Sequence, residues 1–254
     1  MTKRTFIYAT IRISAVCLVW QASGASSAEI KVLGTQSIQI IWNDVGPIFE
    51  RSTGHKVTLT ANLATATKKL IDAGERFDVA IATPPVIDQL IKEGKIIAAT
   101  RTDIVRQGIG VAVRAGAPKP DIGTTEAVKR ALLNAKSVAY LKTGATGQYM
   151  AQLVRRFGIA EQLQAKTLLP ETDIVGPMVA RGEAELGLAG VATLIATSGV
   201  DVVGPLPAEI QFYGIFTGGI SARGMSSDAG KEFIKFLTGP AAISVIKAKG
   251  MEPG

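Results

Sequence analysis

The stretch Gly108-Ile-Gly-Val-Ala-Val113 and the later stretch Gln211-Phe-Tyr-Gly-Ile-Phe-Thr-Gly-Gly-Ile220 decide the fold. Both are longer and more apolar than the other strand-like segments, and together they bracket the middle of the chain. We therefore predict that they are crossover strands between two lobes. Lobe I is expected to comprise residues 29–107 plus 219–254, and lobe II residues 108–218. One continuous open sheet is the alternative.

Strand and helix patterns alternate on both sides of these segments. Ile30–Leu33 has the pattern of a short strand, and the apolar Ile38, Ile41 and Trp42 that follow have helical spacing. Asp78–Ala82 is then typical of a buried strand before another helix. Repeated βα units favour parallel sheets covered by helices. The predicted fold class is therefore α/β, with two lobes and two crossover strands.

The amino-terminal segment has the layout of a secretory signal peptide. Lys3, Arg4 and Arg12 precede the apolar run Ile13–Trp20, and small residues then lead to Ala28. The apolar run is shorter than the roughly 20 residues that a membrane-spanning helix needs. We expect the first 28 residues to be removed and the protein to reach the periplasm. A membrane-anchored amino terminus is the alternative.

Composition limits the chemistry of the exported chain. Cys17 is the only cysteine and lies in the predicted signal peptide, so neither disulfides nor thiol chemistry are expected. Loss of the three basic residues of that peptide lowers the formal charge from +7 to +4. This mild excess, without a basic cluster with interleaved aromatic residues, argues against nucleic-acid binding. It fits a modest preference for anions, and equally a solvated basic surface.

Residues for catalysis are scarce. The single histidine, His55, lies in a helix-to-strand turn, where an exposed position is expected. Zinc binding would have to rely on carboxylates, and no Gly-x-Ser-x-Gly motif is present. Carboxylate pairs for hydrolysis stay open, with Asp44 and Asp78 as candidate members, but both also fit ordinary helix and strand-start positions. We therefore expect a protein without enzymatic activity, metal or cofactor.

Small polar residues occur where strands lead into helices. These junctions are Gly34-Thr-Gln-Ser37, Asn62-Leu-Ala-Thr65, Thr83, Thr143-Gly-Ala-Thr-Gly147 and Glu171-Thr-Asp173. Helix amino ends carry unpaired N–H groups and a positive dipole, which favour anions. In parallel α/β sheets such junctions meet at the carboxyl edge of the sheet. They predict an anion site built by both lobes; helix capping by Ser and Thr is the alternative.

At these residues the chain resembles a known family. The segments that carry the resemblance are Phe49–Val57, Ile71–Ala80, Gly144–Tyr149, Val179–Gly187, Val203–Pro207 and Gln211. Their order is similar to that of the periplasmic molybdate-binding proteins and other type II solute-binding proteins of ABC transporters. The resemblance covers nearly all of residues 30–254. It implies a hinged, two-lobed binder that closes on its ligand.

The resemblance also places site residues. The first-loop serine of the family falls at Thr35–Ser37, the second-loop serine at Ala64 or Thr65, and backbone donors of the second lobe near Thr146 and Thr172. Together with the junctions, this gives ten candidate ligand-binding residues: Thr35, Gln36, Ser37, Ala64, Thr65, Thr83, Thr143, Thr146, Gly147 and Thr172.

Two departures from the family pattern concern the ligand. Ala64 stands most directly at the second serine position, and Gly190 aligns with the tyrosine that caps the oxyanion in molybdate binders. Each lost hydroxyl removes a hydrogen bond worth about 0.5–1.5 kcal/mol. Loss of a tyrosine also opens space, which favours a ligand with more bulk than molybdate. A molybdate-like oxyanion and a small organic carboxylate both stay open.

The sequence thus predicts an extracytoplasmic solute-binding protein of an ABC transporter that binds a small anion between its lobes. Its expected partners are that anion and the transporter permease at the membrane, and we expect a monomer. A secreted hydrolase and a ligand sensor for a membrane signalling partner are the alternatives.

Overall fold

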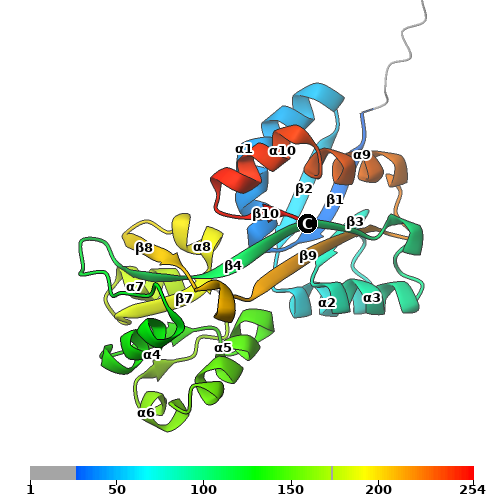
Figure 1. Cartoon of the computed structure of the whole chain (residues 1–254). Coiled ribbons are helices and arrows are strands. Elements are labelled where there is room, and N and C mark those ends of the chain that lie inside the picture. Colours follow the sequence, from blue (N-terminus) through cyan, green and yellow to red (C-terminus); the bar gives the residue numbers. More distant parts are fainter. Residues whose placement is uncertain (1–26, 173) are drawn as a thin grey trace, which may run out of the picture.

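The computed structural model describes residues 27–172 and 174–254 as a two-lobed α/β molecule (Figure 1). The two-lobed type II fold predicted from the sequence is confirmed. Residues 1–26 of the predicted signal peptide lie outside the described residues. Asp173 also lies outside them. No helix in the described ranges has the length and hydropathy needed to cross a membrane.

Lobe I is built from the two ends of the chain. Its elements are β1 (Glu29–Gly34), α1 (Gln36–Thr53), β2 (Lys56–Ala61), α2 (Ala64–Asp72), β3 (Val79–Ala82), α3 (Pro84–Lys92), η1 (Ala98–Thr100), the first half of β4 (Thr102–Arg114), β9 (Tyr213–Ile220), α9 (Ser227–Leu237), α10 (Pro240–Ala248) and β10 (Glu252–Pro253). The βα units predicted for this half of the chain are all present.

Lobe II comes from the middle of the chain. After the second half of β4 it contains α4 (Thr125–Asn134), β5 (Val138–Tyr140), α5 (Gly144–Arg156), α6 (Ala160–Gln164), β6 (Thr167–Leu168), α7 (Val175–Ala180), β7 (Leu186–Gly190), α8 (Val191–Ile195), β8 (Val200–Pro205) and η2 (Ala208–Ile210). The alternation of strands and helices continues here with shorter elements.

Eight of the described strands form one path in the order β2-β1-β3-β9-β4-β7-β5-β6, and β8 and β10 pair with β4 off this path. β1 pairs in parallel with β2 and β3, and β5 pairs in parallel with β6 and β7. β9 is antiparallel to β3 and β4. The parallel strands place the strand-to-helix junctions of each lobe at one edge of its sheet.

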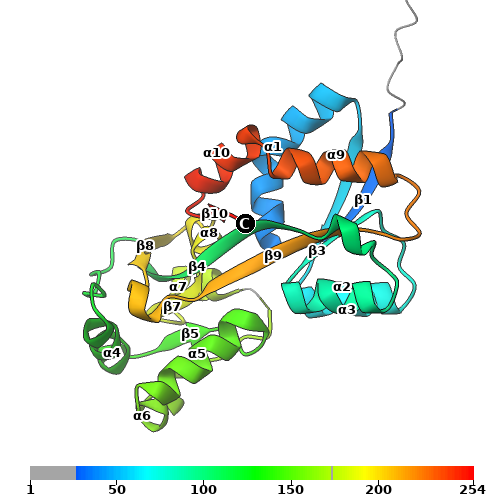
Figure 2. The same cartoon turned by 45° about the vertical axis from the view of Figure 1, so that its right-hand side comes forward.

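β4 connects the two lobes directly. Its residues 102–108 pair with β9, and its residues 109–114 pair with β7 and β8. All of β9 pairs with β3 and with residues 102–108 of β4. We propose that the second lobe boundary lies just before Tyr213 rather than at residue 219, while the first stays at residue 107. β4 and the segment before β9 are the two adjacent connections between the lobes (Figure 2); that they act as a hinge stays a prediction.

Each lobe has a hydrophobic core on both faces of its sheet. In lobe I, α1, α9 and α10 cover one face and α2 and α3 cover the other (Figure 2). Trp42 packs edge-on against Phe49 and Phe233, with ring centroids 5.9 and 5.3 Å apart. Large buried aromatic contacts of this kind stabilise a fold without disulfides. The Phe233 contact packs α1 against α9 and so helps to hold α1 in place.

His55 is buried rather than exposed, which corrects the prediction for its turn. Its side chain lies against Phe49, and only 6% of the residue is accessible. The Ala28 N–H donates to Nδ1 at 3.1 Å, and Nε2 lies 3.2 Å from a Glu232 carboxylate oxygen. The turn is covered by α9, which follows much later in the sequence. His55 therefore has a structural role at the back of lobe I.

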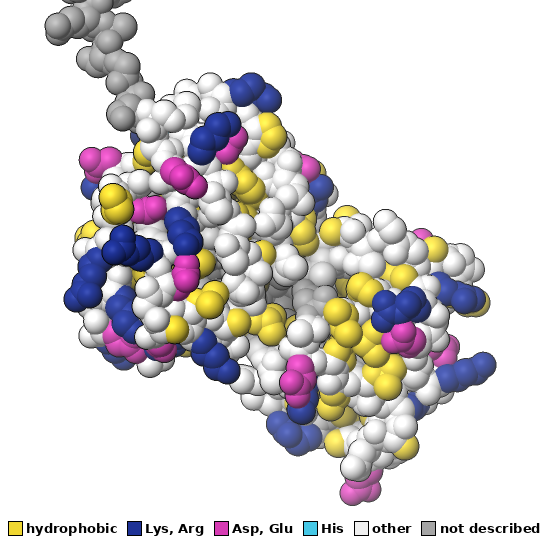
Figure 3. Space-filling view, turned by 180° about the vertical axis from the view of Figure 1, so that it is seen from behind, with side chains coloured by type: hydrophobic (Ala, Val, Ile, Leu, Met, Phe, Trp, Pro, Cys, Tyr) yellow, Lys and Arg dark blue, Asp and Glu magenta, His cyan; other side chains and the backbone are white. Residues whose placement is uncertain are grey.

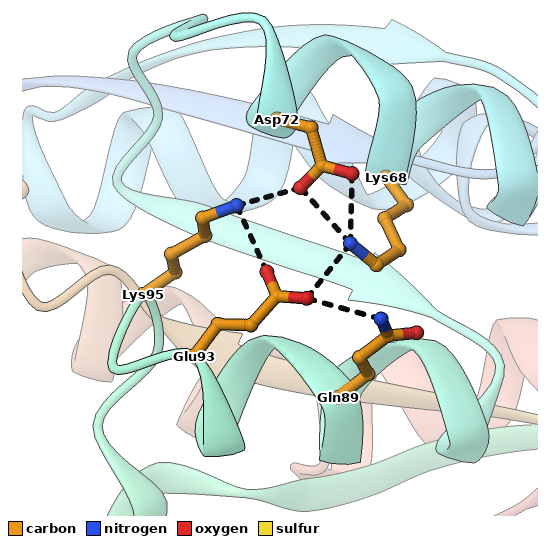
Figure 4. Close-up of polar contacts among 5 residues, drawn as sticks. All are labelled: Lys68, Asp72, Gln89, Glu93 and Lys95. Carbon is orange, nitrogen blue, oxygen red and sulfur yellow. Dashed lines mark hydrogen bonds and ion pairs between the residues drawn. The ribbon is translucent and has the colours of Figure 1, made fainter.

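An ionic network joins the carboxyl ends of α2 and α3 (Figure 4). Lys68 Nζ lies 2.7 Å from Asp72 and 3.0 Å from Glu93, and Lys95 Nζ lies 2.6 and 2.8 Å from the same two carboxylates. Gln89 also donates to Glu93 at 3.0 Å. The network holds α2 and α3 parallel. The amino ends of both helices lie at the lobe boundary. The network thereby helps to set the spacing of those amino ends.

Candidate functional site

A cleft of about 560 Å³ lies between the two lobes. Figure 3 shows the molecular surface hollowed between them. The residues that line the cleft are Thr35, Gln36, Ser37, Asn62–Thr65, Thr83–Pro85, Gln107, Leu141, Thr143–Thr146, Gln148, Gly190, Thr193 and Phe212–Phe216. Its size lies within the range of about 300–1,000 Å³ that is usual for small-molecule sites.

Four helix amino ends converge on the cleft. α1, α2 and α3 come from lobe I, and α5 comes from lobe II. The N–H groups of a first helical turn have no partner inside the helix, and the helix dipole adds a partial positive charge there. None of the four first turns carries an acidic residue that would repel an anion. These four ends are therefore suited to an anion.

The hydroxyls at these ends do not cap their own helices. Thr35, Thr83 and Thr143 are the N-cap residues of α1, α3 and α5, and none makes a side-chain cap bond to a described residue. Thr124, the N-cap of α4 away from the cleft, accepts from the Ala127 N–H at 3.1 Å. Plain capping thus explains Thr124 but not the three threonines at the cleft.

The described residues that line the cleft carry no formal charge. Their polar groups are hydroxyls, amides and backbone, and Tyr213 is their only titratable side chain. Arg106 lies just outside, with its guanidinium 5.2 Å from the centre of the Tyr213 ring and paired with Glu252. An anion here would be held by neutral donors, so no buried ion pair has to be separated when it leaves.

Three polar atoms at the cleft lack a hydrogen-bond partner in the described part of the chain. They are Thr35 Oγ1, Asn62 Nδ2 and Gln107 Oε1, and all three are shielded from solvent. Thr35 is only 5% accessible. Leaving a buried polar group unpaired costs about 1–3 kcal/mol. Such groups are tolerated where a ligand completes the bonding.

Eight of the ten candidate residues lie around this cleft: Thr35, Gln36, Ser37, Ala64, Thr65, Thr83, Thr143 and Thr146. Their role in ligand binding stays a prediction. Gly147 does not line the cleft, because it packs against the chain before α5. A Cβ at this position would stand 2.3 Å from the Leu141 carbonyl oxygen, so the residue is needed for packing. Thr172 is exposed and also outside the cleft.

Sequence reasoning missed several lining residues. Asn62 lies inside a predicted strand-to-helix junction but is not one of the ten candidate residues. Gln107 directly precedes the first predicted crossover strand. Thr193 and Tyr213 come from α8 and β9, whose proximity depends on the fold. One sequence feature could have indicated Gln107 as a lining residue, because it is a polar residue at the start of an apolar crossover strand.

The space beside Gly190 is occupied, which corrects the expectation of an opened site. The Gln107 amide takes that space, and a Cβ on Gly190 would stand 2.5 Å from Gln107 Nε2. Gln107 Nε2 also donates to Ser37 Oγ at 2.7 Å. A polar amide thus stands where the resemblance implies a tyrosine. At this position the cleft floor therefore carries a polar amide rather than empty space.

The carboxylate pair considered from the sequence is not assembled. Asp44 pairs with Lys249 on the outer face of α1. Asp78 is buried and accepts the backbone N–H groups of Lys31 and Ser226, each at 2.9 Å. Within the described ranges, no group of three or more His, Cys, Asp or Glu residues is placed to hold a metal ion.

A family model described as "Bacterial extracellular solute-binding protein" matches residues 30–252. The chain belongs to this family. It is a solute-binding protein of the ABC-transporter type, similar to the molybdate-binding proteins, as the sequence predicted.

Two curated relatives carry different names. A protein from a Pseudomonas species named "Aconitate isomerase" is 30% identical over 230 residues, which cover 88% of this chain and 87% of the relative. The molybdate-binding protein ModA of Azotobacter vinelandii is 28% identical and covers 90% and 92%. The substrate-binding domain of a putative molybdenum ABC transporter from Clostridium difficile shares the fold, with a TM-score of 0.73, 15% identity and coverage of 90% and 100%.

Proposed function

We propose that this chain is a periplasmic receptor that captures a small organic carboxylate in the inter-lobe cleft and delivers it to an ABC-transporter permease. One observation carries the proposal: four helix amino ends from both lobes converge on a cleft lined by uncharged donors. Closure of the lobes would surround the anion with N–H and hydroxyl groups. The unpaired Thr35 and Asn62 donors would then gain partners.

Two observations favour a carboxylate over a tetrahedral oxyanion. The cleft is lined by residues of α1 from lobe I and of α5 from lobe II, and its floor carries the Gln107 amide next to Gly190. The relative at 30% identity is named for aconitate, a tricarboxylate. A planar carboxylate with several separated oxygens could reach donors on both lobes at once.

A thermal-shift screen of the mature protein tests this proposal. The panel would contain citrate, cis- and trans-aconitate, tricarballylate, succinate, molybdate and sulfate. A ligand at 100 times its dissociation constant stabilises the fold by about 2.7 kcal/mol. We expect at least one carboxylate to stabilise the protein and molybdate to have no effect. Stabilisation by molybdate or sulfate alone would refute the carboxylate proposal.

Isomerase activity is the second candidate, and the name of the 30% identical relative favours it. Moving the double bond of an unsaturated carboxylate requires a base that removes a proton from one carbon and an acid that returns it to another. Tyr213 is the only titratable side chain among the described lining residues. The described lining residues thus offer no second titratable group to share the two proton transfers with this phenol, so we favour binding.

The two candidates are separated by a turnover assay. The protein is incubated with cis- or trans-aconitate, and the ratio of isomers is followed by chromatography. We expect both compounds to be recovered unchanged. Conversion that is lost in Tyr213→Phe would establish the isomerase and assign its proton-transfer residue.

A further inference from the structure

Two glutamines flank the connections between the lobes, and they differ in how fully their amides are used. The Gln211 Oε1 accepts from the N–H groups of Ile109 and Phe212 at 2.8 and 3.0 Å, and its Nε2 donates to the Ile109 and Leu206 carbonyls at 3.1 and 3.3 Å. Both ends of the Gln211 amide are therefore fully hydrogen-bonded, and they hold β4 to the segment before β9.

The Gln107 amide has a partner for its nitrogen but not for its oxygen among the described residues. Its Nε2 donates to Ser37 Oγ at 2.7 Å, while its Oε1 is shielded from solvent and meets no donor among the described residues. The amide stands between the amino end of α1 in lobe I and Gly190 in lobe II. It thus contacts both lobes at the floor of the cleft, where a ligand would lie on closure.

Gly190 makes this position possible. A Cβ built on it would stand 2.5, 2.7 and 2.8 Å from the nitrogen, carbon and oxygen of the Gln107 amide. Any side chain at position 190 would displace the amide. Gln107 and Gly190 therefore act as a pair that fixes the amide at the cleft floor.

The unpaired groups have opposite hydrogen-bonding character. The Asn62 amide nitrogen is a donor and the Thr35 hydroxyl can donate, so both suit carboxylate oxygens. The Gln107 Oε1 can only accept. A bare anionic oxygen facing it would leave it unsatisfied, whereas an O–H on the ligand would pair with it.

We propose that Gln107 is the specificity-determining residue of the cleft, and that it selects carboxylates that carry a hydroxyl group. This inference rests on the proposed carboxylate function and narrows it to hydroxycarboxylates. Ser37 shares in the arrangement, because it accepts from Gln107 and so keeps its own proton for a ligand oxygen.

Citrate, isocitrate and tricarballylate provide the test, because they share one carbon skeleton and differ in whether and where a hydroxyl is attached. Calorimetry of the wild-type protein should show citrate or isocitrate binding about tenfold more tightly than tricarballylate. Gln107→Met removes the acceptor at nearly constant size. It should reduce the preference to within about threefold while tricarballylate binding changes little.

Gln164→Met is the matched control, since Gln164 is exposed on α6 and does not line the cleft. It should keep the full preference. Gly190→Ala is a second variant that displaces the amide without changing Gln107, and it should also reduce the preference.

The outcomes separate the two proposals. Equal binding of all three compounds by the wild-type protein, or a preference that survives both Gln107→Met and Gly190→Ala, overturns the role of Gln107 and leaves the carboxylate receptor standing. Binding of none of them, with stabilisation by molybdate or sulfate, overturns both.

Discussion

Thr35→Val should raise the stability of the ligand-free protein and weaken ligand binding. The Thr35 hydroxyl is buried, 5% of the residue is accessible, and Oγ1 has no partner among the described residues. Valine has the same shape and the same branching at Cβ. The hydroxyl does not cap α1, so no cap bond is lost.

The expected magnitudes follow from the cost of an unpaired buried group, about 1–3 kcal/mol. Its removal should raise the free energy of unfolding by about 1 kcal/mol or more. For a chain of this size that corresponds to a Tm increase of about 2–4 °C per kcal/mol. Ligand binding should weaken by about 1 kcal/mol, or roughly fivefold, because a ligand oxygen loses its donor.

Thr124→Val is the matched control, because the Thr124 hydroxyl caps α4 by accepting from Ala127. It should lower the stability by about 1 kcal/mol and leave ligand affinity unchanged. Calorimetric unfolding and ligand titration of the three proteins give all the required quantities. If Thr35→Val destabilised the protein as Thr124→Val does, or kept wild-type affinity, the hydroxyl would not be reserved for a ligand.

Three further predictions concern other parts of the molecule. Ser37→Ala and Thr146→Ala should each weaken binding by about 1 kcal/mol in titration calorimetry; unchanged affinity in both would exclude this cleft. His55→Ala should lower the free energy of unfolding by about 1–3 kcal/mol in urea titrations, because a buried ring against Phe49 is lost. The affinity for the ligand should stay within threefold of wild type. A larger loss of affinity would place His55 at the binding site. Hydrogen bonds from Lys68 and Lys95 lower the pKa of Asp72, so its stabilising effect is present at neutral pH and is lost as the pH falls through the lowered folded-state pKa. The Tm difference between Asp72→Asn and wild type should therefore shrink as the solution is acidified, and a difference that grows on acidification would contradict this.

The fold was largely predictable because its signals are local. Strands such as Ile30–Leu33 and the buried strand after Asp78 repeat a βα pattern, and the rules for parallel sheets then bring the Ser and Thr junctions to one edge. This is why Thr35, Ser37 and Thr146 were expected together before any geometry was known.

The parts that failed depend on contacts between distant segments. His55 is covered by α9, which lies 177 residues further along at Glu232, so the local turn pattern could not show its burial. Gln107 reaches Ser37 across 70 residues, and its place beside Gly190 depends on the pairing of β4 with β7. Gly147 also follows the junction pattern, and its close approach to the Leu141 carbonyl, outside the lining of the cleft, depends on the fold. Its role in ligand binding stays a prediction.

A crystal structure of the protein bound to a small polycarboxylate tests the central claim most directly. The account predicts ligand oxygens about 2.7–3.2 Å from neutral donors of both lobes, including Thr35 and the first turn of α5, without a Lys or Arg side chain on the ligand. A ligand bound outside this cleft, or held by an Arg or Lys side chain, would contradict the claim.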